Sequence, residues 1–136
     1  MRTPQDRPEP AQRAAMTAGY VLLFLFGAVQ GLIGSFNYSR SPVPLAAIIL
    51  AVVILATCVL AGWGMGTFGG GLAPAVGWII ASFILSMPRP NGSVIIANTA
   101  AGQWYLYGGS LAAVTGAAAA FILWARTHPR PRSRPR

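Results

Sequence analysis

The chain carries very few side chains that could take part in a reaction. Its 136 residues include two acids, Asp6 and Glu9, one histidine, His128, and one cysteine, Cys58. Acid–base and nucleophilic catalysis need such a group beside the substrate, but the acids and His128 lie near the two ends of the chain. Cys58 lies alone in an apolar run, where cysteine usually acts as a small buried side chain. The sequence therefore predicts a protein that is not an enzyme, with no catalytic, cofactor-binding or metal-binding residues and no cofactor.

A glycine-rich stretch imitates a nucleotide-binding motif. Gly64 to Gly69 reads G-x-G-x-x-G, a pattern that binds dinucleotides when it follows a strand and opens a helix, with an acid about twenty residues later. Here an apolar run precedes the motif and no acid follows it. We therefore interpret the six glycines between Gly62 and Gly71 as a tight turn between two apolar segments.

The basic residues are ten arginines, and the net charge is +8. Nucleic-acid binding needs a basic face, but these arginines flank apolar stretches, so no nucleic-acid partner is expected. Arg40 and Arg89 follow the first and third apolar stretches and are candidates for anion contacts on the outer face, although single interfacial anchors explain them equally well. The C-terminal arginines are candidates for contacts with inner-leaflet lipid or with a partner: Arg126, Arg130, Arg132, Arg134 and Arg136.

The composition is that of a membrane protein. Hydrophobic residues make up 54% of the chain and charged residues 9%, whereas about a quarter of the residues in soluble domains are charged. A helix needs about 20 residues to cross a hydrocarbon core about 30 Å thick. The sequence predicts an all-α membrane protein with four transmembrane helices and short loops, over about residues 14–36, 43–63, 72–87 and 104–125.

The segments outside these spans are polar or rich in proline. Residues 1–13 and 126–136 have the composition of disordered tails. A signal peptide is an alternative for the first span, but no A-x-A-like cleavage site follows it, so we keep it as a retained helix. The third span is short, which leaves open whether residues 72–87 cross the bilayer or re-enter. We interpret residues 93–103 as an interfacial loop that is partly strand-like over residues 94–96.

The distribution of arginine predicts the orientation. Four spans place both tails on one side, with eight arginines there and only Arg40 and Arg89 on the other. The positive-inside rule then places both tails in the cytoplasm. The use of Arg with abundant Ala, Gly and Pro is typical of a bacterial genome of high GC content, so we expect a multi-pass protein of the bacterial plasma membrane.

Small residues recur every four positions in two of the spans. Such rows let another helix approach closely. We expect the first and fourth helices to contact each other, or one of them to contact a partner, with Gln30 as an interhelical hydrogen-bond donor. The predicted helix-packing seam comprises Gly27, Gly31, Gly108, Ala112, Gly116 and Ala120, and a second row beside it comprises Gly109, Ala113 and Ala117.

Three short pieces resemble a known family. Residues 73–78 (APAVGW), 88–92 (PRPNG) and 105–109 (YLYGG) are similar in order and spacing to small actinobacterial membrane proteins of the DUF6113 family, a domain of unknown function. The likeness covers about residues 14 to 125. In that family an acid often follows the Arg-Pro-x-Gly turn, whereas this chain has Ser93. The resemblance implies an integral membrane protein, with no activity attached.

Two functions are compatible with these features. The first is a non-enzymatic accessory or assembly subunit of a larger membrane complex, in contact with the bilayer and with a protein partner. The alternative is a small solute or lipid transporter or channel that works as a homo-oligomer. For it, the polar residues of the spans would have to line a seam, whereas hydroxyls in helices usually bond their own backbone. These residues are Gln30, Thr57, Ser82, Ser86 and Thr115.

Overall fold

The computed structural model describes residues 9–40 and 42–129, which form four α-helices and no strand. The helices are α1 (Pro10–Asn37), α2 (Leu45–Met65), α3 (Phe68–Ser86) and α4 (Ala100–Thr127). All four are long and apolar enough to cross a membrane. The predicted all-α class with four transmembrane helices is confirmed, and the chain is a multi-pass membrane protein.

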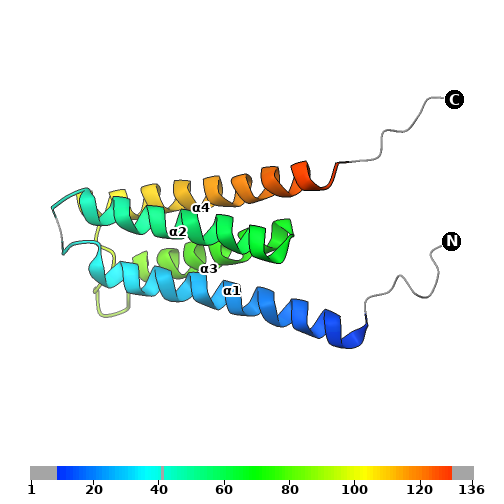
Figure 1. The fold of residues 1–136 in the computed structure, drawn as a ribbon. Helices are drawn as coiled ribbons and strands as arrows, with labels where there is room; N and C mark the ends of the chain where they lie inside the picture. Colours follow the sequence, from blue (N-terminus) through cyan, green and yellow to red (C-terminus); the bar gives the residue numbers. More distant parts are fainter. Residues whose placement is uncertain (1–8, 41, 130–136) are drawn as a thin grey trace, which may run out of the picture.

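The helices lie side by side and alternate in direction along the chain (Figure 1). The start of α1, the α2–α3 turn and the end of α4 lie at one end of the bundle, called here the termini end; the other two connections lie at the opposite loop end (Figure 1). The 19 residues of α3 span about 28 Å and run along the bundle. The helix α3 is therefore a full-length member of the bundle rather than a re-entrant segment.

Helix α1 begins earlier than predicted. Residues 10–13 were assigned to the N-terminal tail, but Pro10 opens the helix, at the position where its missing N–H and fixed φ are tolerated. The hydroxyls of Tyr20 and Thr67 lie 2.9 Å apart, so Tyr20 is level with the α2–α3 turn. The first turns of α1 project past that turn (Figure 1). The rest of the N-terminal tail, residues 1–8, and most of the C-terminal tail, residues 130–136, lie outside the described residues.

The α2–α3 connection is much shorter than the glycine stretch suggests. Only Gly66 and Thr67 separate the two helices. Gly66 has φ 60°, the left-handed conformation that ends many helices, and the Thr67 side chain accepts a hydrogen bond from the Gly70 N–H at 3.2 Å. The prediction that the whole stretch is a turn is wrong, because Gly64 belongs to α2 and Gly69, Gly70 and Gly71 belong to α3. A Cβ on Gly71 would lie 2.6 Å from the Ala120 Cβ.

The α3–α4 connection covers the loop end without forming a strand, so the expectation of strand character at residues 94–96 is wrong. Ile96 is 3% exposed and donates a backbone hydrogen bond to the Leu85 carbonyl at 3.3 Å. The Ala97 N–H donates to the Tyr38 hydroxyl at 3.1 Å, which joins the two loops. Residues 100–103, predicted as loop, belong to α4, where the Thr99 side chain accepts from the Gly102 N–H at 3.3 Å.

Candidate functional site

Helix α1 packs against the parallel helix α3 through glycines. A Cβ on Gly27 would collide with the backbone of Pro74, and one on Gly77 with the backbone of Phe24. A Cβ on Gly31 would lie 3.1 Å from the Trp78 carbonyl oxygen. Without side chains at these points the two backbones come into direct contact, the geometry by which helices associate in lipid.

Helix α2 packs in the same way against the parallel helix α4. A Cβ on Gly116 would lie 2.8 Å from the Cys58 Cβ, and a Cβ on Gly62 would collide with Ala120. Cys58 is 0% exposed and Ala112 is 8% exposed. Five members of the predicted seam thus lie at helix contacts inside one chain, whereas Gly108 does not, since a Cβ on it would meet nothing within 4 Å.

The small-residue rows of α1 and α4 do not pack against each other, so this part of the expectation is wrong, and contact of either helix with a partner stays a prediction. Each pairs closely with a different helix, and no backbone contact joins the described parts of α1 and α4. Figure 1 shows α2 and α3 between them. Spacing of small residues identified the surfaces that pack closely, but it contains no information on which helix each surface meets.

One tyrosine side chain crosses the gap between α1 and α4. The Tyr105 hydroxyl donates a hydrogen bond to the Gly31 carbonyl oxygen at 2.8 Å and lies 3.3 Å from the Ser82 hydroxyl. Its ring lies between Trp78, at 5.3 Å between centroids, and Tyr38, at 5.8 Å. Tyr105 is 1% exposed, although it lies at the start of an apolar run, where tyrosines usually mark the membrane interface.

Glycines make room for this aromatic cluster, here defined as Tyr38, Trp78 and Tyr105. A Cβ on Gly109 would collide with the Trp78 ring, and one on Gly34 would lie 2.6 Å from the Tyr105 hydroxyl. The sequence analysis did not identify the cluster. The signal was the second row of small residues, which begins at Gly109, four residues after Tyr105, and marks the face of α4 that points inward.

The polar residues of the spans do not form one seam. Gln30 donates from Nε2 to the Thr57 hydroxyl at 2.8 Å, which joins α1 to α2, and Thr57 donates to the Val53 carbonyl at 2.8 Å. Ser86 bonds its own helix at 2.7 Å, and Thr115 is exposed. The Oε1 atom of Gln30 is buried without a partner in the described part of the chain.

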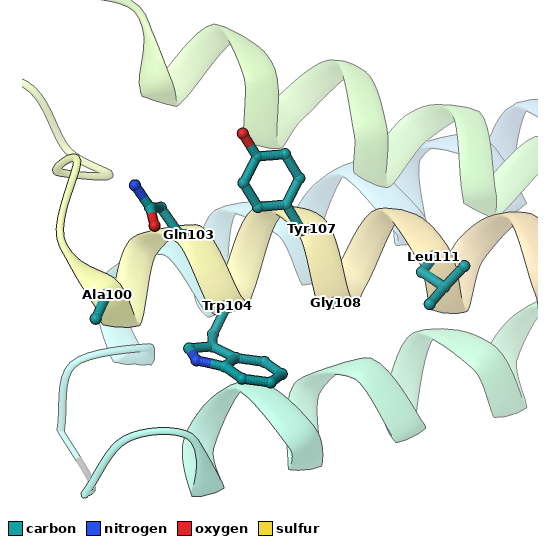
Figure 2. Close-up of a pocket in the computed structure, with 6 residues that line it drawn as sticks. All are labelled: Ala100, Gln103, Trp104, Tyr107, Gly108 and Leu111. Atoms are coloured by element: carbon teal, nitrogen blue, oxygen red, sulfur yellow. The ribbon is translucent and has the colours of Figure 1, made fainter.

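The missing side chain of Gly108 opens a notch on the outer side of α4. The notch has a volume of about 370 Å³. In Figure 2 the side chains of Trp104 and Tyr107 diverge, one below and one above α4 in this view, with Gly108 next to Tyr107 and Leu111 one turn further on. Trp104 and Tyr107 are 53% and 75% exposed. Trp104 and Trp124 are about 30 Å apart along α4, the thickness of a hydrocarbon core, as expected for an aromatic belt.

Helix α3 has an apolar groove on each side of its exposed face. One groove, of about 470 Å³, lies against α1 and includes Tyr20 and Phe24. The other, of about 440 Å³, lies against α4 and includes Val114 and Phe121. Leu72 and Val76 of α3 line both grooves. They form a ridge between two hollows, which we call the α3 ridge.

The arginines proposed as contacts lie at the two ends of the bundle. Arg40 and Arg89 are exposed in the two connections at the loop end. Arg126 lies in the last turn of α4 at the termini end, inside a predicted tail that is helical up to Thr127. It lines a hollow of about 310 Å³ between α2 and α4, together with Trp63 and Trp124. The other four C-terminal arginines lie outside the described residues.

Two of the three pieces that suggested a family meet in the aromatic cluster: Trp78 comes from residues 73–78, and Tyr105 and Gly109 come from residues 105–109. The third piece, residues 88–92, forms a turn in which the Gly92 N–H donates to the Arg89 carbonyl at 2.8 Å. No curated protein and no solved structure is significantly similar to the chain. The model of a family of unknown function, DUF6113, matches residues 2–132. The resemblance seen in the sequence is thereby confirmed, and the chain belongs to the DUF6113 family.

Proposed function

We propose that this protein is a non-enzymatic accessory or assembly subunit of a larger complex in the bacterial plasma membrane, with both termini in the cytoplasm. The observation that carries the proposal is the α3 ridge. Leu72 and Val76 are 38% and 37% exposed, and they separate two grooves with apolar linings along a helix that contacts all three other helices. A transmembrane helix of a partner would fit along such a surface by van der Waals packing.

The filled interior supports a role through contacts rather than through chemistry. Ile54, Cys58 and Trp78 are between 0% and 2% exposed, and the backbones of the paired helices are in close contact. The Tyr105 and Ser82 hydroxyls are satisfied within the bundle. A transport path through a single chain would require a polar lining, so the alternative of a transporter or channel would need a path formed between several copies.

Site-specific photocrosslinking in native membranes tests the proposal. A photoreactive phenylalanine analogue is placed at Val76 on the α3 ridge, and at Ile49 of α2 as a matched control. Ile49 is 54% exposed and lines neither groove. We expect a different membrane protein to be crosslinked at Val76 and not at Ile49, and the same protein to migrate with the full chain in native gels at a fixed ratio.

Two results would overturn the proposal. Crosslinks from Val76 only to a second copy of this chain would favour the homo-oligomeric transporter or channel. Equal crosslinking at Val76 and Ile49 would show that the α3 ridge is no more than a lipid-facing surface. Solute flux into vesicles that contain only the purified chain would then decide whether the homo-oligomer conducts.

A further inference from the structure

The hollow at the termini end is the described cavity that combines an apolar lining with a cation. It lies between the C-terminal ends of α2 and α4, and we call it the α2–α4 groove. At Gly62 and Ala120, two of its lining residues, the helices are in close contact, since a Cβ on Gly62 would collide with Ala120. Its lining consists of Gly62, Trp63, Gly66, Ala120, Leu123, Trp124, Arg126 and Thr127.

Arg126 is a cation without an internal counterion in the described part of the chain. The only acid among the described residues is Glu9, which precedes α1, and α1 does not pack against α4. The Arg126 side chain is exposed at the end of α4. An exposed guanidinium without a counterion favours an anionic partner, and it binds phosphate oxygens through two parallel hydrogen bonds.

The two tryptophans place the groove at the depth of lipid headgroups. Trp63 is 76% exposed, and tryptophans are enriched where hydrocarbon meets headgroups. Arg126 follows Trp124 by two residues, about 3 Å further along the helix axis. The backbone of Arg126 therefore lies just outside the tryptophan level, from which its long side chain can reach the phosphates, and the apolar lining at Leu123 and Ala120 lies just inside it.

We propose that the α2–α4 groove binds one anionic phospholipid from the leaflet at the termini end. The lipid phosphate contacts Arg126, and the glycerol and the upper part of one acyl chain occupy the hollow beside Leu123. Charge selects the lipid class, since Arg126 and the net charge of +8 favour an anionic headgroup over a zwitterionic one. The groove fixes the site, which distinguishes it from the diffuse attraction of the arginine-rich tail.

Native mass spectrometry of the full chain tests the proposal. The protein is titrated in detergent with phosphatidylglycerol and with phosphatidylcholine of the same acyl chains. We expect one phosphatidylglycerol to be retained. Arg126→Gln should lower its affinity about fivefold, the effect of one basic residue at a membrane surface, and Leu123→Trp should lower it similarly by filling the hollow.

Matched variants distinguish binding in the α2–α4 groove from effects of net charge or of an added indole elsewhere. Arg13→Gln removes an exposed charge near the start of α1, and Ile122→Trp adds an indole to an exposed position of α4; neither residue lines the groove. Both should leave lipid retention unchanged. A tail variant that replaces the four arginines beyond residue 129 with glutamine should still retain one phosphatidylglycerol, and excess glycerol phosphate should not displace it.

Four results would overturn the proposal. Equal retention of phosphatidylcholine would exclude charge selection. An equal loss in Arg13→Gln and Arg126→Gln would show an effect of net charge alone. Loss of the lipid in the tail variant, with full retention in Leu123→Trp, would assign binding to the tail. Displacement by glycerol phosphate would show that the site binds a free phosphate ester rather than a lipid.

Discussion

The Tyr105 hydroxyl of α4 donates a hydrogen bond to the Gly31 carbonyl oxygen of α1 at 2.8 Å, although these helices are not packed against each other. The carbonyl already accepts the hydrogen bond of its own helix, and the tyrosine uses its second lone pair. Because Trp78 and Ser82 of α3 also contact Tyr105, this side chain connects three helices.

Removal of that hydroxyl should destabilise the bundle. Tyr105→Phe keeps the ring between Trp78 and Tyr38 but leaves the Ser82 hydroxyl without its buried partner. We expect a loss of about 1–2 kcal/mol of unfolding free energy, measured by thermal or denaturant unfolding in a fixed detergent. Tyr107→Phe is the control, because Tyr107 is 75% exposed, and it should leave stability unchanged. Equal stability of the two variants would contradict the role of Tyr105.

A single methyl group should disrupt the contact between α1 and α3. Gly27→Ala places a Cβ against the backbone of Pro74, and backbone yields less readily than a flexible side chain. We expect a cost of about 1–3 kcal/mol, seen as a lower melting temperature. Gly108→Ala, whose Cβ would meet open space, should be neutral or slightly stabilising because Ala favours the helix. A neutral Gly27→Ala would refute the close α1–α3 contact.

Gly116→Leu should act within the chain rather than on its assembly. A Cβ on Gly116 already lies 2.8 Å from the Cys58 Cβ, so the larger side chain would push α4 away from α2. We expect a fall of about 1–3 kcal/mol in stability at every protein concentration. Native gel migration relative to molecular mass should stay the same among the molecules that remain folded. A change in oligomer size with unchanged melting temperature would instead place Gly116 at a contact between chains.

Substitution of Gln30 and substitution of Thr57 should have different effects on the stability of the protein. Gln30→Leu removes an Oε1 atom that is buried without a partner among the described residues and leaves Thr57 bonded to the Val53 carbonyl, so stability should not fall. Thr57→Val removes the acceptor of the Gln30 amide and should cost about 1–2 kcal/mol. In the double variant most of this loss should be recovered, which a double-mutant cycle measures. Equal losses for both single variants would contradict this reading of the hydrogen bonds.

Much of the fold could be predicted because a bilayer restricts the choices. A long apolar run must satisfy its backbone internally, and a helix does so within one segment. The boundaries and partners depend on tertiary contacts instead. Gly62, Gly70 and Gly71 lie in helices and pack against neighbouring helices or side chains, whereas composition alone suggested a turn. Tyr105 stands at the end of an apolar run, as interfacial tyrosines do, and only the space left by Gly34 and Gly109 reveals that it is buried.

Orientation is the remaining prediction, and the single native cysteine offers a way to test it. Ser39 is exposed in the α1–α2 connection, at the loop end, and His128 is exposed directly after α4, at the termini end, so a cysteine at either position reports one side of the membrane. If the tails are cytoplasmic, a membrane-impermeant maleimide added to intact cells should label Ser39→Cys, and it should label His128→Cys only after the membrane is broken.

Cys58 provides the internal control for this labelling. It is 0% exposed, so it should remain unlabelled in the folded protein even after lysis, and reaction there would reveal unfolded molecules. The reverse pattern, with His128→Cys labelled in intact cells, would place both tails outside. The arginines near the spans would then violate the positive-inside rule, and the α2–α4 groove would face the opposite leaflet.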